Sequence, residues 1–279
     1  MRDYAGVMLM DRIGNNMYQI ASVASYAHAN EMDLKVFIPD TPKFVAYESQ
    51  FMDNIYSKLD VSICHDFGNV VNLPWEYVPL KGRNVTFSGY MQSTKYLDER
   101  TVLGLFPTAD EIMPELREMY GNLDDCVSVN VRRGDFLGLK NFFTVLDTPD
   151  WYVRAMGMFE PGTRFLVTSD DIEWCKANLV GENIAYADRH KTHDNFISTS
   201  NPMDDIEPRR ILGDLYLQTL CGKGNIISAS TFSWWGAYLN RSAAKRVVAP
   251  HPWFDRSCAW SAMADDCKTL PDSWIRLEV

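Results

Sequence analysis

The sequence predicts an α/β protein in which helices cover parallel sheets, and three observations support this prediction. The chain has 279 residues, 46% hydrophobic and 23% charged, which is typical of a globular protein. Short apolar runs alternate with segments of helical periodicity. At this length a single core gives way to two. We therefore expect two compact lobes, residues 1–122 and 123–279, with a cleft between them.

A strand, a loop, a helix and a second strand open the first lobe. An apolar run is broken by Gly14, and apolar residues then recur at helical spacing before the next apolar run. This order is the beginning of a strand–helix–strand unit. The expected elements are strand 5–10, helix 17–27 and strand 34–38.

The middle of the chain is less regular. Strand-like pieces such as 84–87 lie among Pro, Gly and Asn between residues 41 and 106, and their order is not defined by the sequence. Aromatic residues in this stretch can belong to the core or stack on sugar rings. Thr108 and Glu111 have capping-box spacing, which predicts one helix from there to Tyr120.

Strands and helices alternate through the second lobe. This alternation is expected of a parallel sheet with helices on its faces. The expected strands are 126–131, 164–168, 183–187, 225–229 and 246–249, and the expected helices are 151–159, 172–178, 209–221 and 231–239.

The charge and apolar pattern exclude several kinds of protein. The net charge of −10 argues against nucleic acid or an anionic membrane as partner, so any bound phosphate needs a local basic site. No run of about 18 apolar residues or signal peptide occurs. Six cysteines without a C-x-x-C pair suit buried thiols, with disulfides as the alternative. We expect a soluble, cytoplasmic protein with no integral membrane segment.

In open α/β sheets, ligands bind beyond the carboxyl ends of the strands, so the loops there hold the candidate site residues. Arg132, Arg133 and Asp135 follow the predicted strand 126–131. One arginine can fork onto a phosphate while the other pairs with the carboxylate. The alternative is a surface ion pair.

A second loop follows the predicted strand 225–229. Ser230, Thr231, Phe232 and Ser233 begin the next helix, where free amides and the helix dipole attract an anion. The alternative is an ordinary N-cap at Ser230 or Thr231. We expect the two tryptophans that follow to pack in the core.

Two further loops complete the candidate site. Asp170 and Asp171 follow strand 164–168, where a carboxylate can accept hydrogen bonds from a guanine edge or a ribose diol, or can cap the next helix. Gly14, Asn15 and Asn16 follow the first strand with a single glycine, so the dinucleotide pattern G-x-G-x-x-G is absent and NAD is not expected.

The sequence gives no support for metal or hydrolase chemistry. It has no D-x-D string, no H-E-x-x-H, no Walker A and no G-x-S-x-G nucleophile elbow. His190 and His193 lie in a polar stretch and are expected to be solvated. The remaining pattern favours an enzyme without metal or other cofactor that balances a departing diphosphate with arginine and a helix N-terminus.

Six sequence strings occur in one order over nearly the whole chain: GNNMYQIA (14–21), GYMQSTKY (89–96), VNVRRGDF (129–136), TSDDIEW (168–174), IISASTFSWWGAYLN (226–240) and VAPHPWF (248–254). With these strings the chain resembles the inverting α-1,2-fucosyltransferases of glycosyltransferase family 11. The resemblance implies a GT-B architecture of two Rossmann-like lobes facing a cleft. It also implies metal-independent transfer of fucose from GDP-fucose, bound by the C-terminal lobe, to the 2-hydroxyl of a sugar acceptor, often a galactoside.

The resemblance assigns roles by position. It implies that Arg132 binds phosphate, that Arg133 and Asp135 shape its loop, that Asp170 and Asp171 lie near guanosine, that Ser230 to Ser233 begin the phosphate-binding helix, and that Asp214 is an acid on the preceding helix. We expect Gly14, Asn15 and Asn16 to approach the donor sugar. No carboxylate is nominated as general base.

One departure from the family pattern affects the expected function. Asn130 stands where the family motif has histidine, so a cation at this position is missing although a phosphate hydrogen bond is still available. The string Cys221-Gly222-Lys223-Gly224 also departs from the family's usual basic Cys-Lys-His segment. Two alternatives therefore remain: transfer from another GDP-sugar or to another hydroxyl, and a non-catalytic protein that binds a nucleotide sugar or glycan.

Overall fold

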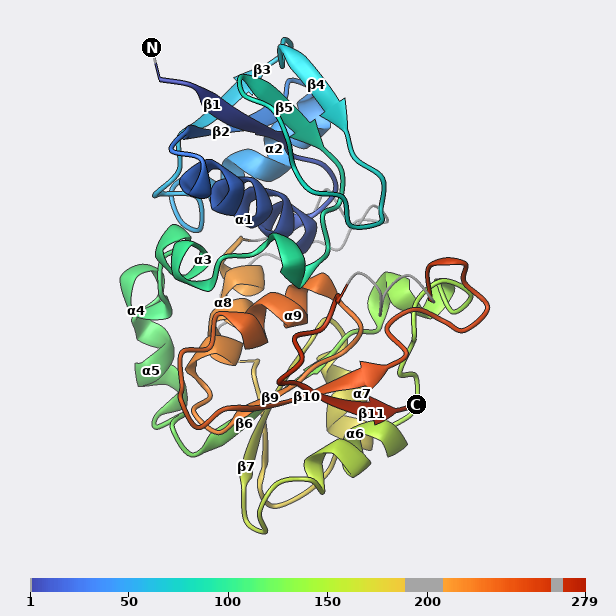
Figure 1. The fold of residues 1–279 in the computed structure, drawn as a ribbon. Helices are drawn as coiled ribbons and strands as arrows, with labels where there is room; N and C mark the ends of the chain where they lie inside the picture. The colour runs from blue at the N-terminus through green and yellow to red at the C-terminus, as the bar shows by residue number, and fades with distance from the viewer. Residues whose placement is uncertain (1, 189–207, 262–267) are drawn as a thin grey trace. The chain divides into compact units, whose positions relative to one another are not determined.

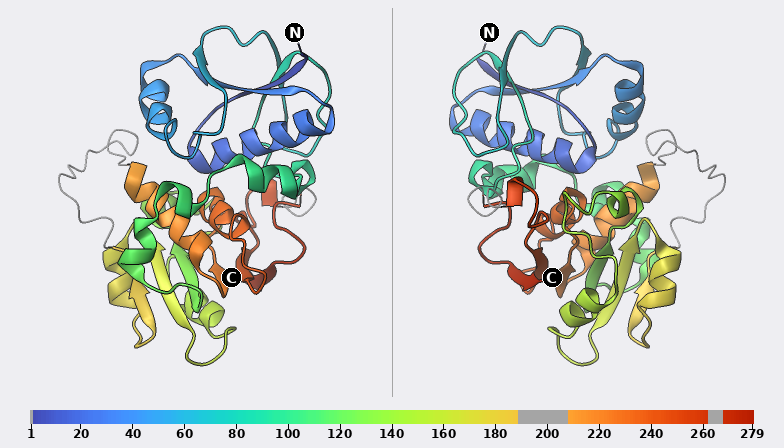
Figure 2. Two further views of the ribbon diagram at one scale, coloured as in Figure 1. Left: turned by 90° about the vertical axis from the view of Figure 1, so that its left-hand side faces the viewer. Right: turned by 90° about the vertical axis from the view of Figure 1, so that its right-hand side faces the viewer.

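The computed structural model describes residues 2–188, 208–261 and 268–279. These residues form two compact units, each an α/β unit built on a parallel sheet (Figure 1; Figure 2). Unit 1 contains the chain up to Thr108 together with Lys268 and Thr269, and unit 2 contains most of the described chain from Ala109 onward. The predicted α/β class is confirmed.

Unit 1 has five parallel strands in the order β3-β2-β1-β5-β4. From the central strand β1 the chain adds β2 and β3 on one side. It then forms β4 at the opposite edge and places β5 between β4 and β1. The point between β1 and β5 is therefore a topological switch point. The strands are β1 (Tyr4–Met8), β2 (Asp33–Pro39), β3 (Val61–Cys64), β4 (Asn69–Asn72) and β5 (Val85–Ser88).

The helices of unit 1 are α1 (Ile13–Ala29), α2 (Pro42–Glu48) and α3 (Glu99–Leu105). Helix α1 packs on β1, and its apolar residues Met17 and Ile20 are fully buried. The chain turns into this helix at Asp11, which has a positive φ of 73°. Because that turn is made at Asp11, the predicted loop Gly14–Asn16 is wrong: these residues form the first turn of α1.

The helix predicted from Thr108 to Tyr120 is interrupted. It forms two short helices, α4 (Ala109–Ile112) and α5 (Glu115–Tyr120), because Pro114 lies between them and lacks a backbone N–H. Both helices belong to unit 2. Burial raises the pKa of Tyr216 on α8 (Pro208–Leu220), and the charge of Glu111 on α4 raises it further, so α4 lies beside α8. The boundary between the two units follows Thr108, 14 residues before the predicted boundary at residue 122.

Unit 2 has six parallel strands in the order β11-β10-β9-β6-β7-β8. From β6 the chain adds β7 and β8 on one side, then β9, β10 and β11 on the other, so the switch point lies between β6 and β9. The strands are β6 (Cys126–Val131), β7 (Arg164–Ser169), β8 (Ile184–Tyr186), β9 (Gly224–Ile226), β10 (Arg246–His251) and β11 (Ile275–Glu278), and the helices besides α4 and α5 are α6 (Asp150–Met156), α7 (Ile172–Asn178), α8 (Pro208–Leu220) and α9 (Thr231–Tyr238).

All five strands predicted for the second lobe are present, and two of them, β8 and β9, are shorter than expected. Strand β9 ends at Ile226, three residues earlier than expected, and the chain then turns toward α9 at Ala229, where the Ser230 N–H donates to the Ser228 carbonyl oxygen at 2.8 Å. It begins at Gly224, whose φ is 135° and where a Cβ would lie 1.9 Å from the Arg246 carbonyl oxygen, so only glycine fits. Strand β11 was not predicted.

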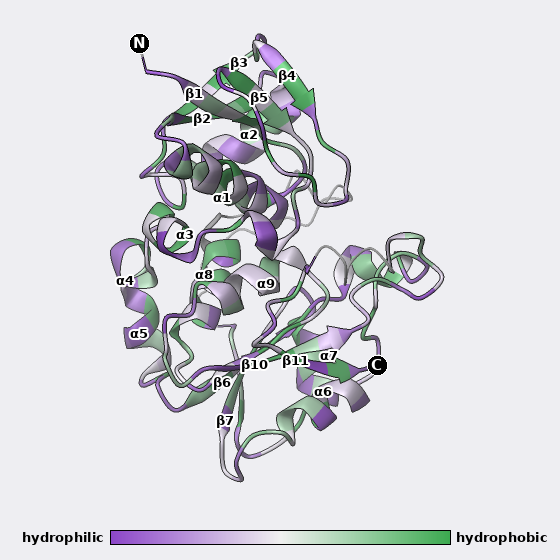
Figure 3. Ribbon diagram, in the orientation of Figure 1, coloured by the Kyte–Doolittle hydropathy of each residue, from purple (hydrophilic) through white to green (hydrophobic). Residues whose placement is uncertain are grey.

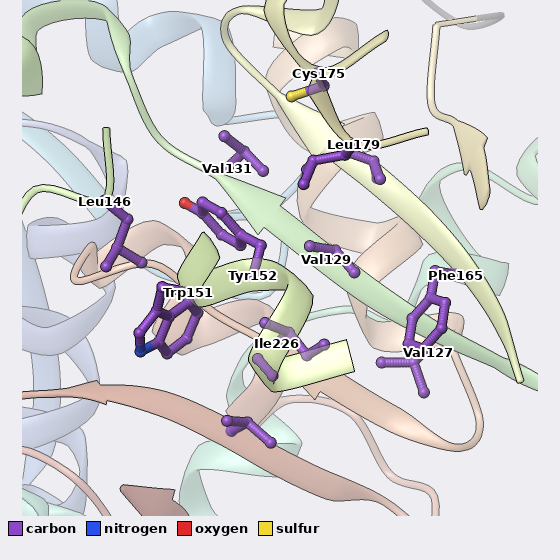
Figure 4. Close-up of a cluster of buried hydrophobic side chains, with 13 residues drawn as sticks. Val127, Val129, Val131, Leu146, Trp151, Tyr152, Phe165, Cys175, Leu179 and Ile226 are labelled. Atoms are coloured by element: carbon purple, nitrogen blue, oxygen red, sulfur yellow. The ribbon is translucent and has the colours of Figure 1, made fainter. Parts of the chain in front are cut away.

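The core of unit 2 is built around β6, which is buried on both faces. Val127, Val129 and Val131 pack with Trp151 and Tyr152 of α6 (Figure 4). Such a near-continuous apolar run is typical of a strand covered by helices on both sides. Hydrophobic positions run through both sheets (Figure 3). The described cysteines are free thiols, as expected from their spacing. Within the described ranges, no helix is both long and apolar enough to cross a bilayer.

Candidate anion site at the second switch point

Two loops meet at the switch point of unit 2, one after β6 and one after β9. Val129 of β6 pairs with Ile226 of β9, so the segments beginning at Arg132 and at Ile227 leave the same edge of the sheet side by side. Ligands of open α/β sheets bind in this position. The sheet therefore brings together two of the loops that were predicted to hold site residues.

Arg132 is held between two carboxylates. Its Nη1 lies 2.7 Å from Asp170 Oδ2 and its Nη2 lies 2.5 Å from Asp135 Oδ1. The side chain remains 25% exposed, and its guanidinium lies 5.3 Å from the ring centre of Phe136. A guanidinium carries five N–H donors, so these two pairs orient it and leave donors for an anion.

Arg133 is turned into the protein. Its side chain is 11% exposed, lies 3.9 Å from the ring centre of Trp174, and donates to Asp171 Oδ2 and to the Asp147 carbonyl oxygen. These contacts fasten the loop to α7. Arg133 thus shapes the loop, and Arg132 is the better placed of the two to meet a ligand.

The two predicted acids at the end of β7 serve this loop. Asp170 accepts the Arg133 backbone N–H at 2.9 Å as well as the Arg132 pair. Desolvation raises the pKa of Asp170, and the Arg132 charge opposes that shift. Asp171 caps α7 by accepting the Trp174 N–H at 3.2 Å, the alternative noted for it above. A Cβ on Gly134 would lie 2.6 Å from Asp170, so glycine allows this close approach.

Asn130 lies inside unit 2 rather than at its surface. Its side chain donates to Thr168 Oγ1 and accepts from Ser228 Oγ, both at 3.0 Å, and the residue is 5% exposed. It therefore joins β6 to β7 and to the loop after β9. Asn130 therefore positions the loop, and its predicted hydrogen bond to a phosphate stays a prediction.

The start of α9 keeps the features of an anion site. Ser230 is the N-cap residue, but its side chain makes no capping hydrogen bond. Ser233 Oγ lies 3.0 Å from the carbonyl oxygens of Ser228 and Ser230 and is buried. Thr231 and Phe232 are half-buried. The first-turn amides are not taken up by the Ser230 side chain, so they and Thr231, rather than Ser233, can face a ligand.

At the first switch point, between β1 and β5, hydrogen bonds link two amide side chains, Gln92 and Asn15, to the carboxylate of Asp11. Asn15 Nδ2 donates to Asp11 Oδ2 at 2.7 Å, and Gln92 Nε2 donates to Asn15 Oδ1 at 2.8 Å. Asn15 is half-buried, whereas Gly14 and Asn16 are buried, so Asn15 is the most accessible of the three, and the expected approach to the donor sugar stays a prediction. Gln92 was missed, although its place just after the predicted strand 84–87 was a signal that could have found it.

The other predicted residues fall in three groups. Tyr47, Phe51 and Tyr56 are at most 2% exposed and belong to the core, as do Trp234 and Trp235. Asp214 lies half-buried on α8. His190 and His193 lie outside the described residues. Among the residues that the structure describes, no group of three His, Cys, Asp or Glu side chains could hold a metal ion.

The two units, each built on a parallel sheet, give a GT-B-like α/β fold, as in solved fucosyltransferases. The model of Glycosyl transferase family 11 matches residues 2–263, and the chain belongs to this family.

Relatives and solved structures agree with this assignment. An alpha-1,2-colitosyltransferase of Escherichia coli is 30% identical over 207 residues, which cover 71% of this chain and 64% of the relative. The O-antigen biosynthesis glycosyltransferase WbnK of Escherichia coli is 32% identical over 156 residues, covering 54% of this chain and 44% of the relative. The matches thus span about half to two thirds of these relatives' length. The fucosyltransferase NodZ from Bradyrhizobium has the same fold, with a TM-score of 0.53 and 12% identity over 85% of this chain and 93% of NodZ.

Proposed function

We propose that the protein transfers L-fucose from GDP-fucose to the 2-hydroxyl of a galactoside acceptor, forming an α-1,2 linkage with inversion. The observation that carries the proposal is that the loop with Arg132 and the loop that leads into α9 follow two neighbouring strands at the switch point of unit 2. A structure of NodZ alpha-1,6-fucosyltransferase soaked with GDP-fucose, with a TM-score of 0.54 to this chain, supports the choice of donor.

The chemistry follows from where charge develops. Departure of GDP leaves negative charge on the β-phosphate while the sugar gains oxocarbenium character. Arg132 is fixed by Asp135 and Asp170, so it meets that charge without first being reoriented. A preorganised donor of this kind contributes about 3–4 kcal/mol to transition-state stabilisation. Together with the amides of α9, it supplies positive charge that many transferases take from a metal ion, and we propose transfer without metal or other cofactor.

A second donor sugar is favoured by a specific observation. The first relative described above is a colitosyltransferase that also forms an α-1,2 linkage, by its name. In this proposal the residues around Arg132 contact the diphosphate and not the sugar, so they do not distinguish fucose from colitose. A non-catalytic protein that binds a nucleotide sugar is the alternative from another class.

We also propose that the reaction takes place in the cytoplasm. The described cysteines are free, and Cys126, Cys175 and Cys221 are buried thiols, as is usual in a reducing compartment.

A transfer assay separates these possibilities. Purified protein is incubated with GDP-fucose, GDP-colitose or GDP-mannose and a panel of galactosides, and products are detected by mass spectrometry and their linkage is determined by NMR. We expect a fucosylated product with a 2-linked galactose. Product from GDP-colitose alone would replace the fucose assignment, and GDP binding without product from any donor would support the non-catalytic alternative.

A further inference from the structure

Glu48, the last residue of α2, is a fully buried acid that the proposed chemistry does not use. Two side chains contact its carboxyl group. Asn16 Nδ2 donates to Oε1, and the Tyr56 hydroxyl donates to Oε2 at 3.0 Å. Asn16 and Tyr56 are themselves at most 1% exposed. The carboxyl group is therefore enclosed by uncharged hydrogen-bonding partners.

No cation balances this carboxyl group among the described residues. Burial raises the pKa of Glu48 to about 8, and the hydrogen bonds from Tyr56 and Asn16 oppose that shift only in part. The other titratable neighbour is Tyr47 on α2, whose own pKa is raised by burial and by Glu48. Asp11 and Arg12, just before α1, act on Tyr47 rather than on Glu48.

Each oxygen of the Glu48 carboxyl group accepts one hydrogen bond, and both donors are neutral side chains. These two bonds favour the ionised form, but they do not replace the water that burial removes from it. A buried carboxylate without a cation is costly. A protonated Glu48 fits these surroundings better.

Helix α2 holds the first turn of α1 at two points. The Tyr47 hydroxyl accepts the Ile13 N–H at 3.1 Å, and Glu48 binds Asn16. Between these two points lies Asn15, which contacts Asp11 and Gln92 at the β1/β5 switch point. Movement of α2 away from α1 would therefore displace Asn15.

We propose that Glu48 is an uncharged positioning residue: as a neutral acid it ties α2 to the first turn of α1 and so fixes the Asp11–Asn15–Gln92 chain. Its catalytic consequence rests on the proposed function, because unit 1 is where we expect a sugar to be bound. Ionisation would place a charge without a cation in this enclosed position, and movement of α2 away from α1 would let water reach that charge. The ordered chain of side chains is therefore lost at alkaline pH.

The sign of the pH effect follows from the direction of the pKa shift. The folded protein keeps the Glu48 proton above the pH at which the unfolded chain releases it. Stability therefore falls as pH rises from about 4.5, the unfolded value, toward 8, and changes no further from this group above that. Glutamine cannot ionise, so Glu48→Gln removes this dependence.

The test measures thermal unfolding of the full chain from pH 5 to pH 9 for the wild type, Glu48→Gln and the exposed control Glu76→Gln. We expect the melting temperature of Glu48→Gln to exceed the wild-type value by an amount that grows between pH 5 and pH 8, while the control follows the wild type. Parallel profiles for all three proteins would overturn the proposal.

Two further measurements keep the test decisive. Tyr56→Phe removes a hydrogen bond that favours the ionised form of Glu48, so the alkaline loss of activity should move to higher pH. An unchanged pH profile of this variant would contradict the proposal. If Glu48→Gln does not fold, Tyr56→Phe provides the test by itself. The ratio of kcat/KM between Glu48→Gln and wild type should rise about tenfold between pH 7 and pH 9. Melting needs no substrate, so its result stands even if no donor sugar is transferred.

Discussion

The two switch points of this molecule share a topology and differ in chemistry. Each lies at the carboxyl edge of a parallel sheet, beside the central strand from which the chain extends in both directions. At β6 and β9 the loops present an arginine clasped by two carboxylates, whereas at β1 and β5 they present amides above a buried acid. The fold thus determines where a ligand can lie, and the side chains determine whether it is an anion or an uncharged hydroxyl compound.

The contrast also indicates where an acidic chain would bind the diphosphate of the proposed donor. The net charge is −10, yet the positive groups at the second switch point are local and oriented. The first switch point needs no positive charge if it binds sugar hydroxyls, and amide side chains both donate and accept hydrogen bonds there.

The largest effect is expected from Arg132→Ala. It removes the oriented cation of the second switch point, so kcat/KM should fall about 10²–10³-fold, or about 3–4 kcal/mol, and GDP should bind more weakly. Steady-state kinetics and calorimetry with GDP measure both. Arg117→Ala is the matched control, since Arg117 also pairs with a carboxylate in unit 2. Unchanged kinetics would remove Arg132 from the site.

A smaller effect is expected from Asn130→Ala, which sharpens the distinction between positioning and binding. The change leaves the hydroxyls of Thr168 and Ser228 without this partner, and loss of buried hydrogen bonds costs about 1–3 kcal/mol of stability. Denaturant unfolding should reveal it, with the exposed Asn141→Ala as control. A stable variant that loses only GDP affinity would instead make Asn130 a direct ligand.

Gln92→Ala tests the first switch point. Asn15 loses one hydrogen bond of about 1 kcal/mol, so kcat/KM for the acceptor should fall about fivefold while GDP affinity stays the same. Gln50→Ala, in which a half-buried glutamine of unit 1 loses a local contact, is the control. If GDP affinity falls instead, the division of roles between the two switch points is wrong.

The smallest effect is expected from removal of divalent metal ions, which should leave the rate of transfer unchanged. If Arg132 and the α9 amides supply the positive charge, initial rates should be the same in EDTA and in Mg²⁺. Loss of activity in EDTA that Mg²⁺ restores would mean that the carboxylates around Arg132 bind a cation during turnover.

The sequence predicted the second switch point better than the first for physical reasons. Arg132 follows a buried strand, so the strand-end rule and its charge point to it together. The roles of Asn130 and Asp171 depend on which hydroxyl or amide lies across the sheet, and pairing of distant strands decides that. Asn15 and Asn16 are adjacent and chemically alike, and only the start of α1 at Ile13 turns one outward and the other inward.

Other differences between prediction and structure have equally specific origins. Pro114 is visible in the sequence as a helix breaker, but the capping-box spacing of Thr108 and Glu111 led to the prediction of one continuous helix. Glu48 follows a tyrosine and precedes a serine, and its burial arises only when α2 packs on α1, which no local pattern reports. Strand β11 is four residues long and lies at the sheet edge, so its periodic signal is weak.

The segment Lys268–Thr269 has a consequence for how unit 1 is completed during synthesis. The Lys268 carbonyl oxygen accepts hydrogen bonds from the Thr94 N–H and hydroxyl, and the Thr269 hydroxyl donates to the Gln92 carbonyl oxygen. A ribosome delivers residues 1–108 long before these two. The nascent first unit therefore emerges with the loop around Gln92 lacking its support, and that loop gains its final shape only when almost all of this sequence has been translated.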